Sequence, residues 1–414
     1  MSRLALLLAF IALLAAPAAA HAQIKPSVET APLFDDEAGG DADADDPAVW
    51  INPKDRRGTL VIGTKKNAGL DVYDLGGRTL QSIPASPGRF NNVDVLSGVK
   101  LGGKTRDFVV ASDRGLDRLR VFAIDADAAL RGRPPLTDVT VANAPLVFSA
   151  SPAEAQAQAN AYGLAGLVDH GDGLIAVSRR SRTAVALYRL IDAGSGRVSY
   201  ARVDGFTLPS TFRLPNGADW TPCEDPGDGP QVEGMTFDPA RGLLFAAQED
   251  VGLWVAKVGR TGFTTTPTLL EKVKEYGIPG TFDPETEECV AGADPGFGGK
   301  HVAADIEGLT LWQIPFVRDV LLVSSQGDSR YVAYGDGGLG RFLGDFTIDD
   351  AGTIDGVQHS DGAQVVAEPL PGFPLGLLVT HDGENTPDPD ERASTNFKYT
   401  RLEKVAVALL LGAR

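Results

Sequence analysis

Short apolar runs that end in small and then polar residues recur six times along the chain. Each run is bounded by turn-forming residues, a pattern typical of a short buried β-strand. The six copies are Leu60–Lys65, Phe108–Arg114, Leu174–Arg180, Leu243–Glu249, Leu321–Gln326 and Leu377–Asp382. Self-similarity on this scale indicates a repeat architecture.

Each copy has further strand candidates beside it. A strand with a polar opening precedes every copy, at Asp45–Trp50, Asn92–Asp94, Tyr162–Leu164, Glu233–Met235, Glu307–Leu309 and Asp361–Ala363. An aromatic-bearing strand follows most copies, at Leu70–Tyr73, Leu119–Phe122, Val185–Tyr188, Leu253–Trp254 and Tyr331–Tyr334. This pattern predicts an all-β fold, a six-bladed β-propeller of four-stranded antiparallel blades. A β-sandwich or two stacked β domains is the alternative.

A propeller closes when the two ends of its chain share a blade. We expect the C-terminal segments Asn396–Tyr399 and Val405–Leu409 to be the partners of the N-terminal segment. A single blade cannot bury both faces of its sheet, so residues 23–414 should form one domain.

The first residues predict export. A positive start, an apolar run over Leu4–Ala16 and a small-x-small site at Ala20–Ala22 are typical of a signal peptide, here residues 1–22. A membrane anchor is the alternative, but the run is short for a bilayer. We therefore expect a periplasmic or extracellular protein, in which Cys223 and Cys289, the two cysteines of the sequence, form a disulfide.

Composition narrows the class of partner. The 48 glycines among 414 residues favour a turn-rich β protein. The net charge of −17 argues against nucleic acid or an anionic membrane as partner and suits a protein that collects cations. We expect a monomer that acts on a small molecule.

Strand direction predicts a charged ring on one face. Consecutive strands of a blade are antiparallel, so the start of the first strand and the end of the second lie at the same edge. Both places carry polar or charged residues in every repeat. The predicted ring comprises Asp45, Asp46, Asp94, Glu233, Glu307 and Asp361, together with Lys65, Arg114, Arg180 and Glu249.

Acids without nearby Cys or His indicate an oxygen-ligand site for Ca²⁺ or Mg²⁺, and Ca²⁺ tolerates irregular coordination better. The strongest candidates are Asp305 with Glu307 on one strand face, Glu249 with Glu233, and Asp355 with Asp361 around a short loop. The alternative is that some of these acids cap strands or bind structural calcium between blades.

Basic residues beside metal ligands suggest phosphate recognition, for which arginine offers paired donors. Lys65, Arg114 and Arg180 are these candidates, with a solvated salt-bridge network as the alternative. Tyr162 could donate to a phosphate oxygen or pack at the channel rim. No sequence motif for a covalent nucleophile is present, so metal-activated water is the simplest hydrolytic mechanism.

The motifs resemble those of the β-propeller phytases. The matching runs occur in family order over about residues 41–405: Asp45–Trp50, Lys65-Lys66, Phe90–Asp94, Ala111–Arg114, Tyr162-Gly163, Glu233–Met235, Glu249-Asp250, Asp305–Leu309, Ser324–Gly327, Asp355 with Asp361-Gly362, His381–Asn385 and Asn396–Lys398. The resemblance implies a calcium-dependent enzyme that hydrolyses phytate, inositol hexakisphosphate.

The resemblance also implies residue roles. Acids that match positions around catalytic calcium ions are Asp46, Glu233, Glu249, Asp305, Glu307, Asp355 and Asp361. Lys65, Arg114 and Tyr162 match phosphate ligands, while Asn92, Asp94, Asp382 and Glu384 resemble positions nearer structural calcium sites.

This sequence also departs from the family pattern. Arg180 stands where the family usually has lysine, and Arg179 is an alternative equivalent. Insertions around 215–230 and 270–300, which carry both cysteines, are foreign to the pattern.

The expected mechanism is attack on phosphorus by a water held between calcium ions. Glu233 and its neighbouring acids hold that water, while Lys65, Arg114 and Arg180 stabilise the developing charge. Two alternatives are another calcium propeller hydrolase of the lactonase type, which would not need these basic residues, and a propeller that binds phosphate ligands without turnover.

Overall fold

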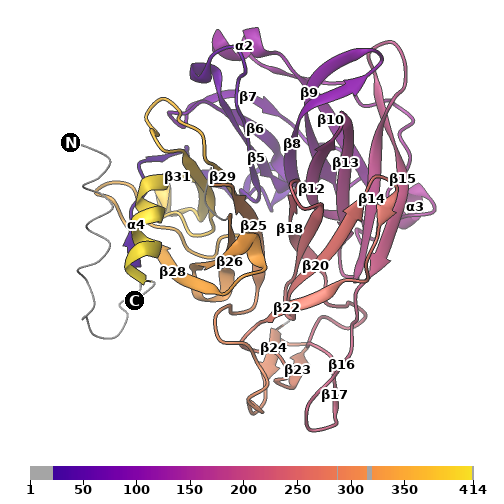
Figure 1. Cartoon of the computed structure of the whole chain (residues 1–414), viewed down its shortest axis with the longest axis vertical. Coiled ribbons are helices and arrows are strands. Elements are labelled where there is room, and N and C mark those ends of the chain that lie inside the picture. Colours follow the sequence, from indigo (N-terminus) through magenta and orange to yellow (C-terminus); the bar gives the residue numbers. More distant parts are fainter. Residues whose placement is uncertain (1–21, 287, 315–318, 413–414) are drawn as a thin grey trace.

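The six predicted buried runs are the second strands of six antiparallel blades in the computed structural model (Figure 1). The structure describes residues 22–286, 288–314 and 319–412. In five blades the chain runs from the innermost strand outward, so that strands adjacent in the sheet follow one another in sequence. The six-bladed propeller predicted from the repeats is therefore confirmed.

The first three blades each contain four strands. Blade 1 comprises β4 (Pro47–Trp50), β5 (Leu60–Lys65), β6 (Gly69–Tyr73) and β7 (Thr79–Ile83). Blade 2 comprises β8 (Phe90–Leu101), β9 (Lys104–Asp113), β10 (Arg118–Ile124) and β11 (Leu136–Asp138). Blade 3 comprises β12 (Ala161–Asp169), β13 (Asp172–Arg179), β14 (Ala184–Asp192) and β15 (Val198–Thr207).

The last three blades carry additional or borrowed strands. Blade 4 comprises β18 (Val232–Asp238), β19 (Leu243–Gln248) and β20 (Gly252–Gly259), and both β21 (Gly262–Phe263) and β22 (Thr268–Lys272) pair with β20. Blade 5 comprises β25 (Ile306–Trp312), β26 (Val320–Ser325), β27 (Arg330–Tyr334), β28 (Phe342–Ile348) and β1 (Ala22–Ile24). Blade 6 comprises β29 (Ala363–Val366), β30 (Leu377–Asp382), β31 (Ser394–Arg401), β2 (Val28–Glu29) and β3 (Leu33–Phe34).

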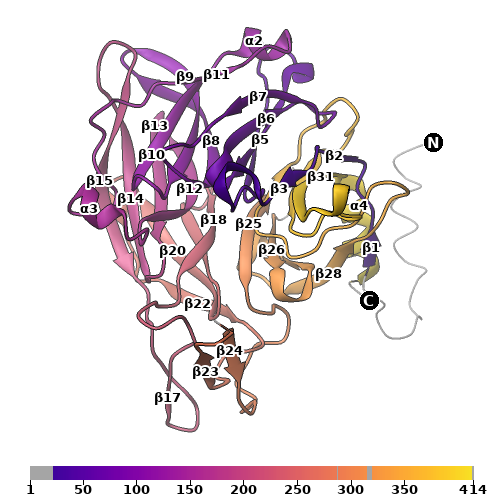
Figure 2. The ribbon, with the colours of Figure 1, turned by 180° about the vertical axis from the view of Figure 1, so that it is seen from behind.

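Two hairpins project from the propeller and correspond to the predicted insertions (Figures 1 and 2). They are β16 (Phe212–Arg213) with β17 (Asp219–Trp220), and β23 (Gly280–Asp283) with β24 (Glu288–Ala291). The α-helices of the described chain are α2 (Ala126–Leu130), α3 (Pro152–Ala155) and α4 (Leu402–Gly412). The 3-10 turns are η1 (Glu37–Gly39), η2 (Arg56–Gly58), η3 (Lys66–Ala68), η4 (Gln326–Asp328), η5 (Asp336–Gly338) and η6 (Pro389–Glu391). None of the helices in the described ranges is long and apolar enough to cross a bilayer.

The hydrophobic core lies between adjacent blades. Between blades 2 and 3, for example, Phe108 packs in one cluster with Ile175 and Tyr188. A second cluster joins blades 6 and 1 through Phe397 and Val61. Because each sheet buries both faces against its neighbours, a blade contributes strands of almost continuous apolar residues, as the sequence pattern indicated.

Strands from the N-terminal segment complete blades 6 and 5. The residues of β2 pair with β31 in the register Val28↔Tyr399 and Glu29↔Lys398, which confirms the predicted role of Asn396–Tyr399. The β1 strand adds to blade 5 parallel to β28 (Figure 2). Residues 1–21 of the predicted signal peptide lie outside the described residues, whereas Ala22, the last residue of that prediction, begins β1.

The second predicted C-terminal partner is a helix rather than a strand. Residues Val405–Leu409 lie in α4, which packs against β28 and β1. The buried positions Leu402, Val405 and Leu409 are spaced three and four residues apart, the period of one helix face. The helix therefore contacts the N-terminal segment, as expected, through side chains and not through strand pairing.

A buried lysine neutralises the acids at this closure. Lys398 on β31 is fully buried, and its Nζ lies 2.9 Å from Glu29 Oε2 and 3.2 Å from Asp382 Oδ2. The same ammonium also contacts Asp355. The strand that closes the propeller is thus tied to blade 6 by backbone pairing and by a buried ion cluster.

Replacing Lys398 should destabilise the protein strongly. Lys398→Met leaves buried carboxylates without their cation, and we expect a loss of about 3–5 kcal/mol in the free energy of unfolding. Denaturant unfolding in chelator measures this loss. The matched control is Lys54→Met, because Lys54 forms an exposed ion pair with Asp127 and should cost less than about 1 kcal/mol. Equal effects of the two substitutions would contradict the assignment.

Candidate functional site

The innermost strands of the six blades enclose a central channel. β4, β8, β12, β18, β25 and β29 each contact the next in a closed ring. Their polar openings all lie at one end of this ring, beside the ends of the second strands, as the antiparallel pairing requires. The ring gathers side chains that are far apart in the sequence.

Two backbone features direct the acids toward the channel. The pairing of β18 with β19 is irregular between Val232 and Met235, and β8, β12 and β25 have the same irregularity at the same place. Such a bulge re-aims a side chain. The following glycine permits close approach, since a Cβ at Gly234 would lie 2.0 Å from the Glu307 carbonyl oxygen. A Cβ at Gly163 would likewise lie 2.0 Å from the carbonyl oxygen of Glu233.

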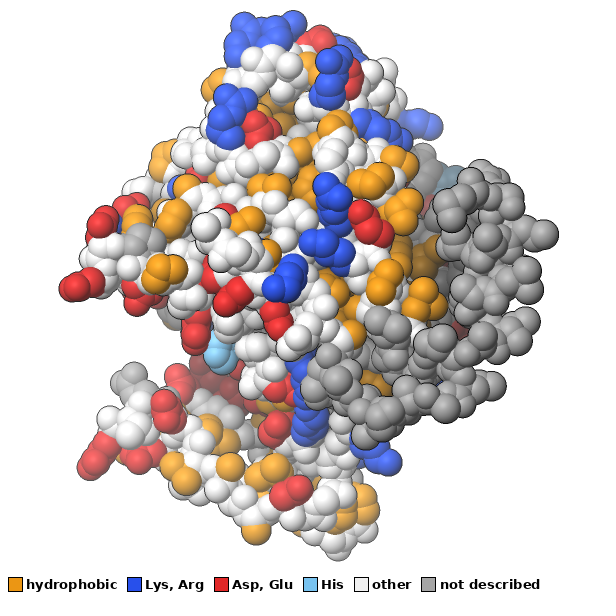
Figure 3. Space-filling model, turned by 90° about the vertical axis from the view of Figure 1, so that its left-hand side faces the viewer, with side chains coloured by type: hydrophobic (Ala, Val, Ile, Leu, Met, Phe, Trp, Pro, Cys, Tyr) orange, Lys and Arg blue, Asp and Glu red, His pale blue; other side chains and the backbone are white. Residues whose placement is uncertain are grey.

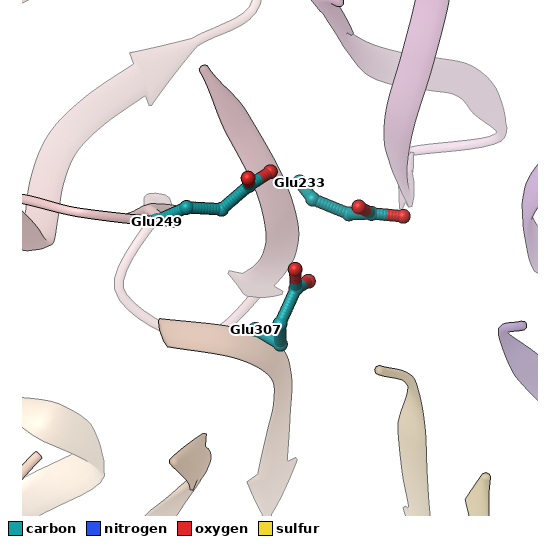
Figure 4. Close-up of side chains that lie close together, drawn as sticks. All are labelled: Glu233, Glu249 and Glu307. Atoms are coloured by element: carbon teal, nitrogen blue, oxygen red, sulfur yellow. The ribbon is translucent and has the colours of Figure 1, made fainter. Parts of the chain in front are cut away.

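Three glutamates converge at the mouth of the channel (Figure 4). Glu233 on β18, Glu249 directly after β19 and Glu307 on β25 each place a carboxylate oxygen within 4.8 Å of the other two. Glu233 and Glu307 are both 5% exposed, and Glu249 is 9% exposed. Glu249 Oε1 and Glu307 Oε2 are buried and have no hydrogen-bond partner in the described structure. Buried carboxylate oxygens of this kind are ligands that a hard divalent cation prefers.

Two neutral side chains support Glu233. Asn91 Nδ2 donates to Glu233 Oε1 at 2.7 Å, and the Tyr162 hydroxyl also hydrogen-bonds this carboxylate. Burial, followed by the charge of Asp361, raises the pKa of Glu233 to about 7, although the bond from Tyr162 opposes the shift.

The other glutamates are also hard to ionise together. Burial and the charge of Glu233 hold the pKa values of Glu249 and Glu307 well above the usual range. Protonation or a bound cation is needed to offset this repulsion.

The channel below the glutamates is narrow and polar. A cavity of about 30 Å³ is lined by Asp46, Asn92, Asp94, Glu233, Glu307 and Asp361. That volume has room for a water molecule or a small ion. Asp46 Oδ2 accepts from the Val93 backbone at 3.0 Å. Asp94 accepts from the backbone of Val95 at 2.6 Å and of Gly166 at 2.7 Å, so backbone donors already bind both of its oxygens.

The donor chemistry fits a hard divalent cation. The converging ligand atoms are carboxylate oxygens, which Ca²⁺ and Mg²⁺ prefer, and at least two of them are buried without a partner. Asp361, which also lines this cavity, accepts a hydrogen bond from Gln326 Nε2 at its Oδ1, and its Oδ2 lies 3.5 Å from His381 Nδ1. Asp361 thus adds another carboxylate next to the cluster.

Arginines lie beside the acids. Arg114 donates to the neutral Gln158 Oε1 at 3.2 Å and forms no ion pair with a carboxylate of the described residues. Burial and the neighbouring Arg89 and Arg180 lower the pKa of Arg114 to about 10. Like charges held together in this way create a site for an anion.

The structure distinguishes the two adjacent arginines that the sequence left open. Arg180 is the one that lies close enough to influence Arg114. Arg179 instead donates to the Ala159 carbonyl at 2.7 Å and to Glu154. Arg180 therefore belongs to the arginine cluster, which we define as Arg89, Arg114 and Arg180.

The two adjacent lysines also face different surroundings. Lys65 Nζ lies 2.9 Å from Asp71 Oδ1. Lys66 Nζ donates to Asp43 at 2.9 Å. Burial lowers the pKa of Lys66, but the negative charges of Asp45, Asp361 and Asp43 outweigh burial and raise it. Lys66 therefore interacts with Asp43, Asp45 and Asp361, whereas Lys65 pairs with Asp71.

A second group of acids borders the glutamates. Asp250 hydrogen-bonds both Asp305 and Glu224, and burial holds its pKa well above the usual range. Glu224 comes from the insertion that the Cys223–Cys289 disulfide ties to β24, and this pairing agrees with the sequence prediction. Figure 3 shows acidic side chains around a hollow between the propeller body and its projecting hairpins.

Not all the predicted metal ligands come together. Asp355 and Asp382 contact the Lys398 ammonium at the closure of blade 6, and Asp355 also accepts from Thr386. Glu384 lies at the surface beside His359. These acids form a group distinct from the three central glutamates.

Sequence reasoning did not assign several residues that the structure brings to the site. They are Asn91, Gln231, Lys66, Arg89 and Glu224. Asn91 and Lys66 adjoin the predicted residues Asn92 and Lys65. Glu224 adjoins Cys223, and its position depends on a long-range disulfide.

Comparisons with known proteins identify the family of this chain. The family model described as Phytase matches residues 1–213 and 280–412. The 3-phytase of Bacillus subtilis (strain 168) is 30% identical over 390 residues, which cover 93% of this chain and 85% of that protein. A structure titled as a calcium-binding protein, regucalcin, from Agrobacterium tumefaciens str. C58 has a TM-score of 0.48 at 11% identity, covering 92% of this chain and 96% of that one.

The fold and site define a β-propeller with an acid cluster at the channel mouth and arginines beside it. The chain belongs to the phytase family, because the family model matches more than half of it. Membership supports a hydrolase that acts on phosphate esters.

The metal-free protein should lose stability as pH rises from about 4.5 to about 7. The folded-state pKa of Glu233, about 7, exceeds its ordinary value of 4.5, so in this range the folded state binds more protons than the unfolded state. The free energy of unfolding therefore falls with rising pH. Calcium should remove most of this decline, because it favours the ionised carboxylates. Thermal unfolding midpoints in chelator and in calcium measure both effects, and a midpoint in chelator that rises over this range would contradict them.

Proposed function

We propose that this protein is a calcium-dependent phytase, which releases inorganic phosphate from inositol hexakisphosphate. One observation carries the proposal: buried carboxylate oxygens without a hydrogen-bond partner adjoin Arg114 and Arg180, which form no ion pair with a carboxylate of the described residues. A calcium ion and a phosphate group together would satisfy both sets. The family match and the 3-phytase of Bacillus subtilis support the substrate class.

Carboxylates around the channel mouth would hold the calcium ions. Glu233, Glu249 and Glu307 are the first candidates, with Asp46, Asp305 and Asp361 close by. Asn92 and Asp94 line the deeper cavity and would serve an ion there. When bound, calcium supplies charge neutralisation for the phosphate and lowers the pKa of a coordinated water.

Residues of this chain would orient the reactants. Glu233, positioned by Asn91 and Tyr162, would hold the attacking water in line with phosphorus. Arg114 and Arg180 would donate to the phosphate oxygens as charge develops. Lys65 remains a proposed phosphate ligand on family resemblance, and Lys66 joins it because of its place beside the central acids.

The proposal extends to the location of the protein. A disulfide between Cys223 and Cys289 suits an oxidising compartment, so we propose export to the periplasm or the extracellular space. The Asp355 and Asp382 group would act at blade closure, where a structural calcium could join Lys398. We further propose that the protein works as a monomer, since one chain supplies the complete site.

Phosphate release from phytate should need both calcium and Glu233. We expect Glu233→Gln to lower kcat by about 10²- to 10⁴-fold, because the variant cannot accept a proton from the attacking water. Colorimetric phosphate assays in calcium and in chelator measure this loss. The matched control is Glu368→Gln, since Glu368 is 53% exposed and pairs with Arg56 at the surface. Absence of release from folded wild-type protein in calcium would overturn the proposed function.

Substitution of Arg114 distinguishes phosphate chemistry from lactone hydrolysis. Arg114→Ala should lower kcat/KM for phytate roughly tenfold to a hundredfold, the cost of a lost hydrogen bond to a charged group. The control is Arg179→Ala, whose side chain is held by Ala159 and Glu154. Unchanged kcat/KM for phytate in Arg114→Ala would contradict the proposed role of Arg114. Hydrolysis of a lactone that tolerates this substitution, without phosphate release from phytate, would favour the lactonase alternative.

A further inference from the structure

The turn that carries Arg180 is held in place by the end of the insertion around residues 215–230. Ser181, the next residue after Arg180, has a φ of 57°, in the left-handed region that residues other than glycine seldom adopt. The Ser181 hydroxyl donates to Asp228 Oδ2 at 2.5 Å, and its carbonyl accepts from the Gly229 amide at 3.1 Å. The conformation of the turn therefore depends on contacts with the insertion.

Gln231 makes a further contact with this turn and extends it to the central glutamates. Its Oε1 accepts from the Ser181 amide at 2.7 Å. Its Nε2 donates to Glu249 Oε2 at 2.9 Å and lies 3.4 Å from the Tyr162 hydroxyl. One side-chain amide thus joins the residue after Arg180 to a carboxylate of the central glutamates.

The two partners of this amide account for the presence of glutamine. A backbone N–H can only donate and an ionised carboxylate can only accept, so a side chain between them must offer both an acceptor and a donor. Glutamate here would repel Glu249, and an apolar side chain would deprive the Ser181 amide of its acceptor. The backbone adds a second tie, because the Gln231 carbonyl accepts from the Glu249 amide at 3.1 Å.

Both ends of this bridge belong to the proposed reaction site. Glu249 is one of the three glutamates whose oxygens converge, and Arg180 and Gln231 both line a cavity of about 250 Å³. The spacing between a cation at the glutamates and a phosphate group at Arg180 thus depends on Gln231. Such spacing matters, since a misplacement of about 1 Å can lower the rate of a reaction about a hundredfold.

We propose that Gln231 is a positioning residue that sets the spacing between Glu249 and Arg180, so that a cation and a phosphate group can meet there. The proposal deepens the proposed function, on which it rests for the identity of the cation and of the anion. It also gives the insertion a role, because residues 228–231 hold the turn from which Arg180 reaches the phosphate group.

Binding of inorganic phosphate to the calcium-loaded protein tests this role without turnover. Gln231→Leu should weaken phosphate binding at least about tenfold, as expected when a hydrogen bond to a charged group is misplaced. Titration calorimetry measures this loss. The matched control is Gln81→Leu, because Gln81 is also partly buried and makes two hydrogen bonds with the Leu136 backbone, on the outermost strand of blade 1. A smaller loss in Gln231→Leu, or an equal loss in the control, would overturn the proposal.

A double-mutant cycle shows whether Gln231 acts through Arg180. In a protein that already carries Arg180→Leu, Gln231→Leu should have little further effect on phosphate binding, so the two losses are not additive. Additive losses would indicate two independent effects and would reject the positioning role. Should Gln231→Leu fail to fold, Gln231→Glu takes its place in the cycle, because it keeps the side-chain volume and the acceptor for Ser181 and changes only the donor to Glu249.

This proposal and the proposed function fail separately. Coupling between Gln231 and Arg180 in a protein that releases no phosphate from phytate would sustain the positioning role and reject the proposed function. Additive losses in a protein that does release phosphate from phytate would sustain the proposed function and reject the positioning role.

Discussion

Repulsion among buried carboxylates is the constraint on which the site depends. Glu233, Glu249 and Glu307 are each at least nine-tenths buried, and their oxygens lie within 4.8 Å of one another. Three negative charges at that separation cannot coexist in a low-dielectric space without protons or a cation. The proposed cation binding and the expected dependence of stability on pH both follow from this one arrangement.

The propeller supplies the rigidity that such an arrangement requires. Each acid stands on an innermost strand or directly after a second strand, and the glycines beside them let neighbouring backbones approach to a distance that a Cβ would forbid. Closure by β2 and the buried Lys398 keeps the ring from opening. Packing between the blades thus offsets the free-energy cost of holding these carboxylates together. At the closure, the ammonium group of Lys398 offsets the charge of the nearby acids.

The fold was largely predictable because its determinants are local and repeated. Short apolar runs and their polar ends identified every second strand and placed the acids at one face. The helix at Val405–Leu409 was predicted as a strand, because a short apolar segment fits both the 3.6-residue period of a helix and the two-residue period of a strand. At the site, the surroundings of Lys66 depend on the turn η3, and the position of Glu224 depends on a disulfide to a distant hairpin, so neither follows from spacing along the chain.

The central claim is that one cluster of acids binds a cation that in turn meets a phosphate held by arginines. A crystal structure of the protein grown with calcium and soaked in inorganic phosphate tests it most directly. The account predicts cation density between Glu233, Glu249 and Glu307, with a phosphate oxygen between that ion and Arg114. A phosphate bound elsewhere, or an empty space between the three glutamates at saturating calcium, would contradict it.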